Sequence, residues 1–157
     1  MKGKRGLFLT FLALVVILGL TGPVQSQGRR FKSPGEQIYY TGIASNGHDI
    51  FRYGGPMWIR MHGGGCVSCH GTHGRGGVPV MMGMAIPTDI RYKTLTEKEN
   101  HVHGGKEKEH HYTHALIKRA ITQGLAADGE LLSWTMPRWH MSEADLDALI
   151  DYLKTLE

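Results

Sequence analysis

The sequence predicts a small all-α domain with long glycine-rich loops. Three segments combine helical spacing of apolar residues with recognisable ends: Pro34 to Thr41, Tyr112 to Gln123, and a segment that starts after Ser142 and runs to about Leu156. Glycines cluster between Ile43 and Gly77, where they favour turns over helices or long strands. Together these features predict a helical protein whose loops carry the functional groups.

The first 26 residues have the pattern of an export signal. Met1 to Arg5 is basic, Leu7 to Leu20 is largely apolar, and small and polar residues follow up to Ser26. The apolar stretch is shorter than the roughly 20 residues that span a bilayer comfortably. We therefore expect a cleaved signal peptide over residues 1–26, rather than a retained anchor, and a periplasmic or otherwise exported single domain over residues 27–157.

The formal net charge of +4 comes mainly from this leader. Lys2, Lys4 and Arg5 lie within it, so residues 27–157 carry 15 basic and 14 acidic side chains, a net charge of +1. This balance does not indicate a nucleic-acid partner, and any charge used for docking must be local.

The first helix is expected over Pro34 to Thr41. Ser33 can cap its amino end, and Glu36 can complete a capping box. Gly42 is a natural stop, and Gly35 would allow another helix to approach closely. The stretch from Ile43 to Gly65 that follows is an insert with many turn signals, in which short hairpin pairing around His48 to Tyr53 is an option.

Cys66, Cys69 and His70 form the pattern Cys-x-x-Cys-His, which is typical of covalent haem attachment. The two thiols can each form a thioether with one haem vinyl group, and His70 can bind the iron. Its second ring nitrogen would then donate a hydrogen bond, for which the carbonyl of Pro79 is our expected acceptor. The alternative is a zinc site in which His101 to His114 supplies two further ligands.

Glycines from Gly71 to Gly77 can wrap tightly over a flat ligand. Beyond them, residues 97–111 are strongly polar and predict a solvated, histidine-rich loop. Its histidines, and one just after it, could bind copper or zinc, although a hydrophilic loop that titrates near neutral pH is the simpler interpretation. These residues are His101, His103, His110, His111 and His114.

The chain ends in two further helices with clear boundaries. Tyr112 to Gln123 places apolar residues on one face and has Gly124 just past its end. In the last helix Ser142 is the cap and Asp145 sits at the capping-box position, ahead of an apolar stripe. We expect that stripe to pack on the first helix.

Met136 is the predicted sixth ligand of the haem iron. It precedes Pro137 on an extended loop just before the last helix, where its sulfur can reach the second face of a haem. The competing ligands are His140 and three methionines, which more often serve as apolar filler around a haem. These methionines are Met81, Met82 and Met84.

These motifs resemble, in their order, those of the class I c-type cytochromes, the monohaem cytochrome c family. The matching segments are Gly35 to Tyr39 for the first helix, Cys66, Cys69 and His70 for the haem motif, Gly71 to Gly77 for the glycine loop, Met136-Pro137 for the methionine loop, and Leu149 to Leu153 for the last helix. The resemblance implies a cytochrome c-like arrangement of helices around one covalently bound haem c.

The resemblance also implies an electron-transfer protein rather than an enzyme. We expect an exported carrier of single electrons in a respiratory or related chain, with redox proteins as donor and acceptor, among them a membrane oxidase or reductase complex. Neither nucleic acid nor a small-molecule substrate is expected. The alternatives are a haem enzyme or sensor with an open sixth position, and a subunit of a larger redox complex with a metal-binding histidine-rich loop.

Two further sets of residues are candidates for the haem surroundings. Arginines suit the haem propionates, and the candidates are Arg75, Arg91 and Arg138. Tryptophans are expected to line the haem pocket or the helix packing, and these are Trp58, Trp134 and Trp139.

Overall fold

The computed structural model describes residues 29–97, 99–103 and 106–156, with residues 99–103 and 106–110 described by their backbone. The chain divides into two units, Met1–Arg30 and Phe31–Glu157, and all the elements named below belong to the second. The predicted signal peptide, residues 1–26, lies outside the described residues.

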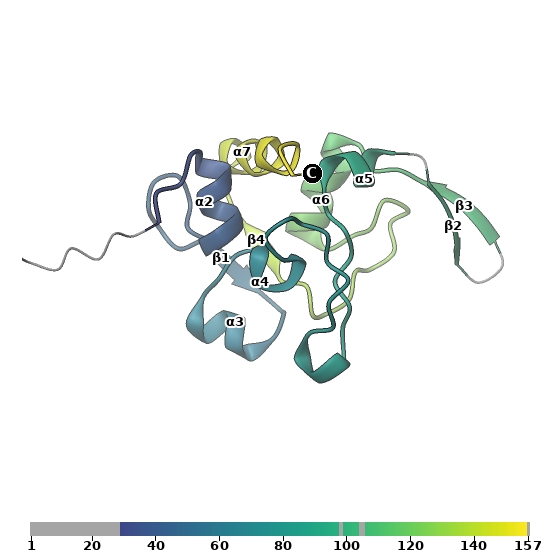
Figure 1. Cartoon of the computed structure of the whole chain (residues 1–157), viewed down its shortest axis with the longest axis horizontal. Coiled ribbons are helices and arrows are strands. Elements are labelled where there is room, and N and C mark those ends of the chain that lie inside the picture. The colour runs from purple at the N-terminus through teal and green to yellow at the C-terminus, as the bar shows by residue number, and fades with distance from the viewer. Residues whose placement is uncertain (1–28, 98, 104–105, 157) are drawn as a thin grey trace, which may run out of the picture. The chain divides into compact units, whose positions relative to one another are not determined.

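Helices make up most of the regular structure (Figure 1). In chain order they are α2 (Pro34–Thr41), α3 (Met57–His62), α4 (Val67–His70), the 3-10 helix η1 (Met81–Gly83), α5 (Tyr92–Thr96), α6 (His114–Gln123) and α7 (Glu143–Leu153). The three predicted helices are confirmed, although α6 starts at His114 and α7 ends at Leu153. Among the described residues no helix has the length and apolar character needed to cross a bilayer.

Two short antiparallel ribbons accompany the helices. β1 (Phe51–Tyr53) pairs with β4 (Arg138–His140), and β2 (Glu99–His103) pairs with β3 (Lys106–His110). The helical fold class is therefore confirmed with this small addition. The first ribbon joins segments from opposite ends of the domain, so no local sequence signal could have revealed it.

The predicted histidine-rich loop at residues 97–111 contains the β2–β3 ribbon instead. The dipeptide Gly104-Gly105 between two short polar runs is a hairpin signal, which the polar composition of this region masked. His110 belongs to β3 and therefore does not share a helix face with His114 in α6. The side chains of residues 98–110 lie outside the described part of the chain, so the metal-binding hypothesis for this segment stays a prediction.

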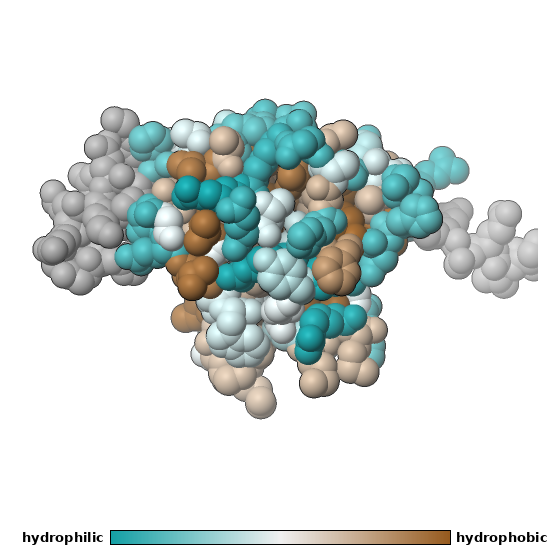
Figure 2. Space-filling model, turned by 180° about the vertical axis from the view of Figure 1, so that it is seen from behind, coloured by the Kyte–Doolittle hydropathy of each residue, from teal (hydrophilic) through white to brown (hydrophobic). Residues whose placement is uncertain are grey.

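Two lobes extend from the helices around α4. The first is the insert 43–65, in which an Ile43–Asp49 bridge closes one turn, β1 pairs with β4, and α3 forms the tip. The local hairpin pairing considered for this region is present only in the Ile43–Asp49 bridge, because residues 51–53 pair with β4 instead. The second lobe is residues 78–86, closed by a bridge between Val80 and Ala85. Figure 2 shows apolar side chains on both lobes, with a gap between them.

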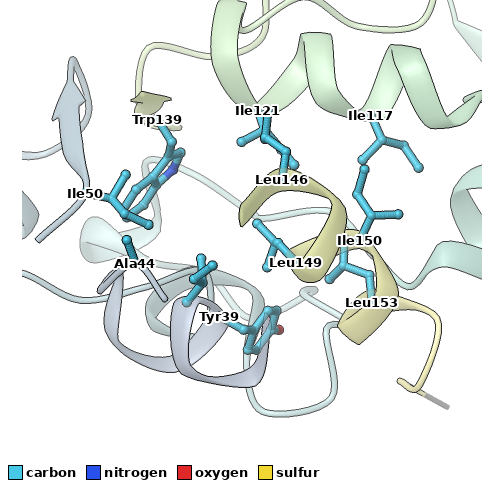
Figure 3. Packing of buried hydrophobic residues seen from close by; sticks show 11 residues of the cluster. Tyr39, Ala44, Ile50, Ile117, Ile121, Trp139, Leu146, Leu149, Ile150 and Leu153 are labelled. Atoms are coloured by element: carbon cyan, nitrogen blue, oxygen red, sulfur yellow. The ribbon is translucent and has the colours of Figure 1, made fainter. Parts of the chain in front are cut away.

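The hydrophobic core lies where α7 contacts both α2 and α6. Figure 3 shows Leu146 and Ile150 of α7 beside side chains of α6, with α2 along the other side of α7. A Cβ added at Gly35 would lie 1.9 Å from the carbonyl oxygen of Ala148, so α2 and α7 touch through their backbones. Both expectations for this crossing, the close approach at Gly35 and the packing of the last helix on the first, are confirmed.

Candidate cofactor site

The Cys-x-x-Cys-His motif forms one turn of helix. Cys66 is the first residue of the turn, and its carbonyl accepts the amides of Cys69 at 3.1 Å and of His70 at 2.9 Å. Residues three and four positions apart lie on one side of a helix. The turn therefore directs both thiols and the imidazole toward the same side, where all three line one cavity.

The cavity has a volume of about 320 Å³ and is mostly apolar. Its walls come from α4, α6, α7, the lobe at residues 78–86 and the segment 132–137. Cavities that bind small ligands have this character, with few polar groups among many apolar ones. Apolar residues of α6 and α7, among them Ile117, Ile121 and Leu149, form part of the wall.

His70 is held by a single backbone partner. Its Nδ1 lies 2.8 Å from the carbonyl oxygen of Thr88, and not beside Pro79, so the expected acceptor was wrong. No sequence signal marks a backbone carbonyl 18 residues away. With Nδ1–H donating to this oxygen, Nε2 carries the lone pair that could bind a metal. Burial lowers the pKa of His70, which also favours the neutral, ligating form.

Met136 lines the same cavity as His70. Met81 and Met84 line it as well, so these two remain competitors for the sixth position. Met82 is fully exposed, and His140 is exposed on β4 with its ring 5.7 Å from that of Phe51. All four predicted site residues therefore line one cavity, and the competing ligands Met82 and His140 lie outside it.

The two cysteines lie in an environment that disfavours thiolates. Burial raises the pKa of the Cys66 thiol to about 12 and also raises the pKa of Cys69. Zinc binds cysteine as thiolate, whereas a thioether sulfur carries no charge. Among the described residues there is no group of three or more His, Cys, Asp or Glu side chains suited to a metal ion. The burial of the thiols weighs against the zinc alternative, whereas the side chains of His101, His103 and His110, which would supply further ligands, lie outside the described residues.

Two of the arginines proposed for the haem propionates have other partners. Arg91 forms an ion pair with Asp89, and the guanidinium of Arg138 donates to backbone carbonyls. Arg75 is exposed.

The prediction for the tryptophans is right for Trp139, which lines the cavity and is 5% exposed. It is wrong for Trp58 and Trp134, which are 40% and 62% exposed.

The insert 43–65 also supports the cavity, which the sequence did not predict. Arg52, the buried central residue of β1, donates its Nε–H to the carbonyl of Ile59 at 3.2 Å, and its guanidinium lies 5.2 Å from the centre of the Trp139 ring. Ile59 and Trp139 both line the cavity. No sequence signal distinguishes the buried Arg52 from the exposed Arg60 in the same insert, because arginine is usually exposed.

This cavity fits a covalently attached haem. The two thiols are three positions apart on one turn, an imidazole nitrogen and a methionine side chain reach the same space, and the remaining walls are apolar enough for a porphyrin. The bonds from Cys66, Cys69, His70 and Met136 to such a group stay predictions.

Comparison with known proteins gives one result. The family model described as cytochrome c matches residues 60–157, which includes the Cys-x-x-Cys-His turn, Met136 and α7. Neither the curated proteins nor the solved structures contain a match. Because this match covers more than half of the chain, the protein belongs to the cytochrome c family, whose members bind covalent haem c and generally transfer electrons.

Proposed function

We propose that this protein is an exported monohaem carrier that passes single electrons between a donor and an acceptor protein of a respiratory or related chain. The observation that carries the proposal is that Cys66, Cys69, His70 and Met136 all line one apolar cavity. When bound, a haem c supplies reversible one-electron chemistry.

Each of the four residues has a distinct part in this proposal. Cys66 and Cys69 form the thioethers, and His70 and Met136 are the axial ligands. A histidine and a methionine together fill both axial positions, so no position is left for a substrate. The apolar walls keep water away from the cofactor, which limits the rearrangement of solvent on each transfer.

The leader pattern of residues 1–26 supports the proposed export. The test is the mass of the protein purified from the periplasm of a bacterial host that attaches haem c. We expect a coloured protein with the mass of a chain that starts near residue 27 plus one haem, unchanged by denaturation. A colourless protein with the bare polypeptide mass would refute the proposal.

The two lobes are the surface that we propose for docking to redox partners. Both carry exposed apolar side chains on either side of the gap seen in Figure 2. On α3 these are Met57, Trp58 and Met61, and on the second lobe they are Val78, Met82, Met84 and Ile86. Flexible methionine side chains suit a surface that must fit two different partners and release both.

The charge of this surface favours partners with an acidic rim. From Ile50 to Thr88 the sequence contains arginines and histidines but no aspartate or glutamate. We expect the anionic oxidant hexacyanoferrate(III) to oxidise the reduced protein more slowly as salt concentration rises, because salt screens the attraction. A cationic cobalt(III) complex should show the opposite trend. Equal salt dependence for both oxidants would argue against a cationic docking surface.

Carbon monoxide separates the electron carrier from the alternative with an open sixth position. If both axial positions are filled, the reduced protein should resist binding of carbon monoxide. Rapid stoichiometric binding would instead support a haem enzyme or sensor.

A further inference from the structure

The guanidinium of Arg138 lies inside the chain segment that carries Met136. Its Nη1 donates to the carbonyls of Ser133, at 3.1 Å, and of Met136. Its Nη2 donates to the carbonyl of Leu132, at 3.0 Å, and makes a longer contact of 3.5 Å to that of Gly124. The four contacts match the four terminal N–H groups of an arginine.

These contacts replace the regular structure that the segment lacks. Residues 132–136 form neither helix nor strand, so their carbonyls need partners from elsewhere. The amide of Leu132 donates to the carbonyl of Gly124 at 2.8 Å, which ties the start of the segment to the end of α6. Arg138 donates both to the carbonyls of Gly124 and Leu132, at the start of the segment, and to the carbonyl of Met136, at its end. Its guanidinium therefore links the two ends of the segment.

Gly124 shows how closely the guanidinium fits. This residue ends α6 with φ of +69°, and a Cβ at this position would lie 1.9 Å from Nε of Arg138. A side chain at residue 124 would therefore push the guanidinium out of place. The end of the helix and the arginine form one unit.

We propose that Arg138 is the positioning residue for Met136. It acts on no cofactor itself, but cross-links the carbonyl of Met136 to those of Leu132 and Ser133, so that the methionine side chain stays in the cavity. The inference rests on the proposed function, in which Met136 is the sixth ligand. The planar guanidinium of an arginine can donate to all four carbonyls at once, whereas the ammonium group of a lysine could donate to only some of them.

Arg119 offers a matched control. It is also an arginine that donates to backbone carbonyls, at 2.6 Å to Ala126 and 3.1 Å to Ala127. Those carbonyls belong to the turn that precedes the Met136 segment. Removing its side chain should loosen a neighbouring turn without freeing Met136.

The experiment measures how fast imidazole binds to the oxidised holoprotein, together with the near-infrared band of sulfur-to-iron coordination and the melting temperature. Imidazole can bind only when the native sixth ligand leaves. We expect Arg138→Gln to bind imidazole about tenfold faster or more, which is the factor that corresponds to losing one charge-assisted hydrogen bond. Arg138→Lys should also bind faster than wild type, and Arg119→Gln should bind at the wild-type rate.

Two results would overturn the proposal. One is a wild-type imidazole rate in Arg138→Gln, and the other is an equal increase in Arg119→Gln, which would indicate general loosening. If Arg138→Gln does not fold, Gly124→Ala provides the same test by displacing the guanidinium. Failure of the proposed function is a separate result: the wild-type protein would lack the sulfur-to-iron band, and Met136→Ala would leave imidazole binding unchanged.

Discussion

The Nδ1 atom of His70 lies 2.8 Å from the carbonyl oxygen of Thr88. A hydrogen bond at this position orients the ring and increases the electron donation of the other nitrogen. The acceptor is a backbone group, so a change of the Thr88 side chain would not remove it. The position of this carbonyl depends instead on the residue that packs against it, which is Gly76.

Gly76→Ala is expected to raise the reduction potential. A Cβ at Gly76 would lie 2.2 Å from the carbonyl oxygen of Pro87 and 2.5 Å from that of Thr88, so the Thr88 carbonyl must shift away from His70. A weaker hydrogen bond makes the imidazole a poorer donor and destabilises ferric iron. The increase should be up to about 60 mV, the one-electron equivalent of a hydrogen bond worth roughly 1.5 kcal/mol.

Gly77→Ala is the control for this change. Gly77 also has a positive φ, of +76°, but nothing lies within 4 Å of an added Cβ. Both variants therefore carry similar backbone strain, and only one displaces Thr88. Redox titration should show a wild-type potential for Gly77→Ala. Equal potentials in the two variants would show that the contact with Thr88 does not tune the site.

Met136→Ala is expected to abolish the near-infrared band of sulfur-to-iron coordination and to allow the reduced protein to bind carbon monoxide. Met81→Ala should keep the band, although Met81 lines the same cavity. The opposite outcome, with the band lost in Met81→Ala and kept in Met136→Ala, would transfer the ligand role to the second lobe. Absorption spectra of the oxidised and reduced variants measure both effects.

Arg52→Gln should lower the free energy of unfolding by about 2–3 kcal/mol. The change leaves the carbonyls of Ile50 and Ile59 without their buried donor, and unsatisfied buried groups cost roughly 1–3 kcal/mol each. Arg60→Gln removes an exposed arginine from the same insert and should change stability by less than about 0.5 kcal/mol. Chemical denaturation of the two holoproteins makes the comparison, and similar losses in both would contradict an anchoring role for Arg52.

Asp145 should make the protein sensitive to acid. Burial alone would raise the pKa of this carboxyl, but hydrogen bonds from the Ser142 hydroxyl at 2.7 Å and the Ser45 amide at 3.1 Å hold the pKa below its usual value. A carboxyl with a lowered pKa in the folded state stabilises the protein above the unfolded pKa of about 3.8. This stabilisation is lost as the pH falls through the lower, folded value.

Asp145→Asn tests this pH dependence. We expect a loss of about 1 kcal/mol at pH 7, typical of a weakened helix cap, and a smaller difference from wild type at pH 3. Asp151→Asn, on the exposed face of α7, should stay within about 0.5 kcal/mol of wild type at both values. A difference between wild type and Asp145→Asn that does not shrink in acid would contradict the expected titration.

Local chemistry explains why much of the fold could be predicted. Ser33 and Ser142 cap α2 and α7 through contacts within one turn, and Gly42 and Gly124 end helices in the left-handed conformation. The Cys-x-x-Cys-His turn is equally local, so the spacing of its residues along the chain was enough to identify them. The polar ribbon at β2 and β3 was missed because composition outweighed the weaker Gly-Gly signal.

The sequence by itself determined the cofactor motif and four of the six ends of the three predicted helices, because these depend on residues within a few positions of each other. Only the tertiary structure decided which groups support them: Thr88 behind His70, Arg138 inside the Met136 segment, and Arg52 beneath Trp139. Thr88 and Trp139 reach their partners through packing between separated segments, whereas Arg138 folds back on residues two to six positions before it. Two of the three contacts involve backbone carbonyls, which every residue carries. A carbonyl becomes specific only through its position in space, and the sequence does not encode that position locally.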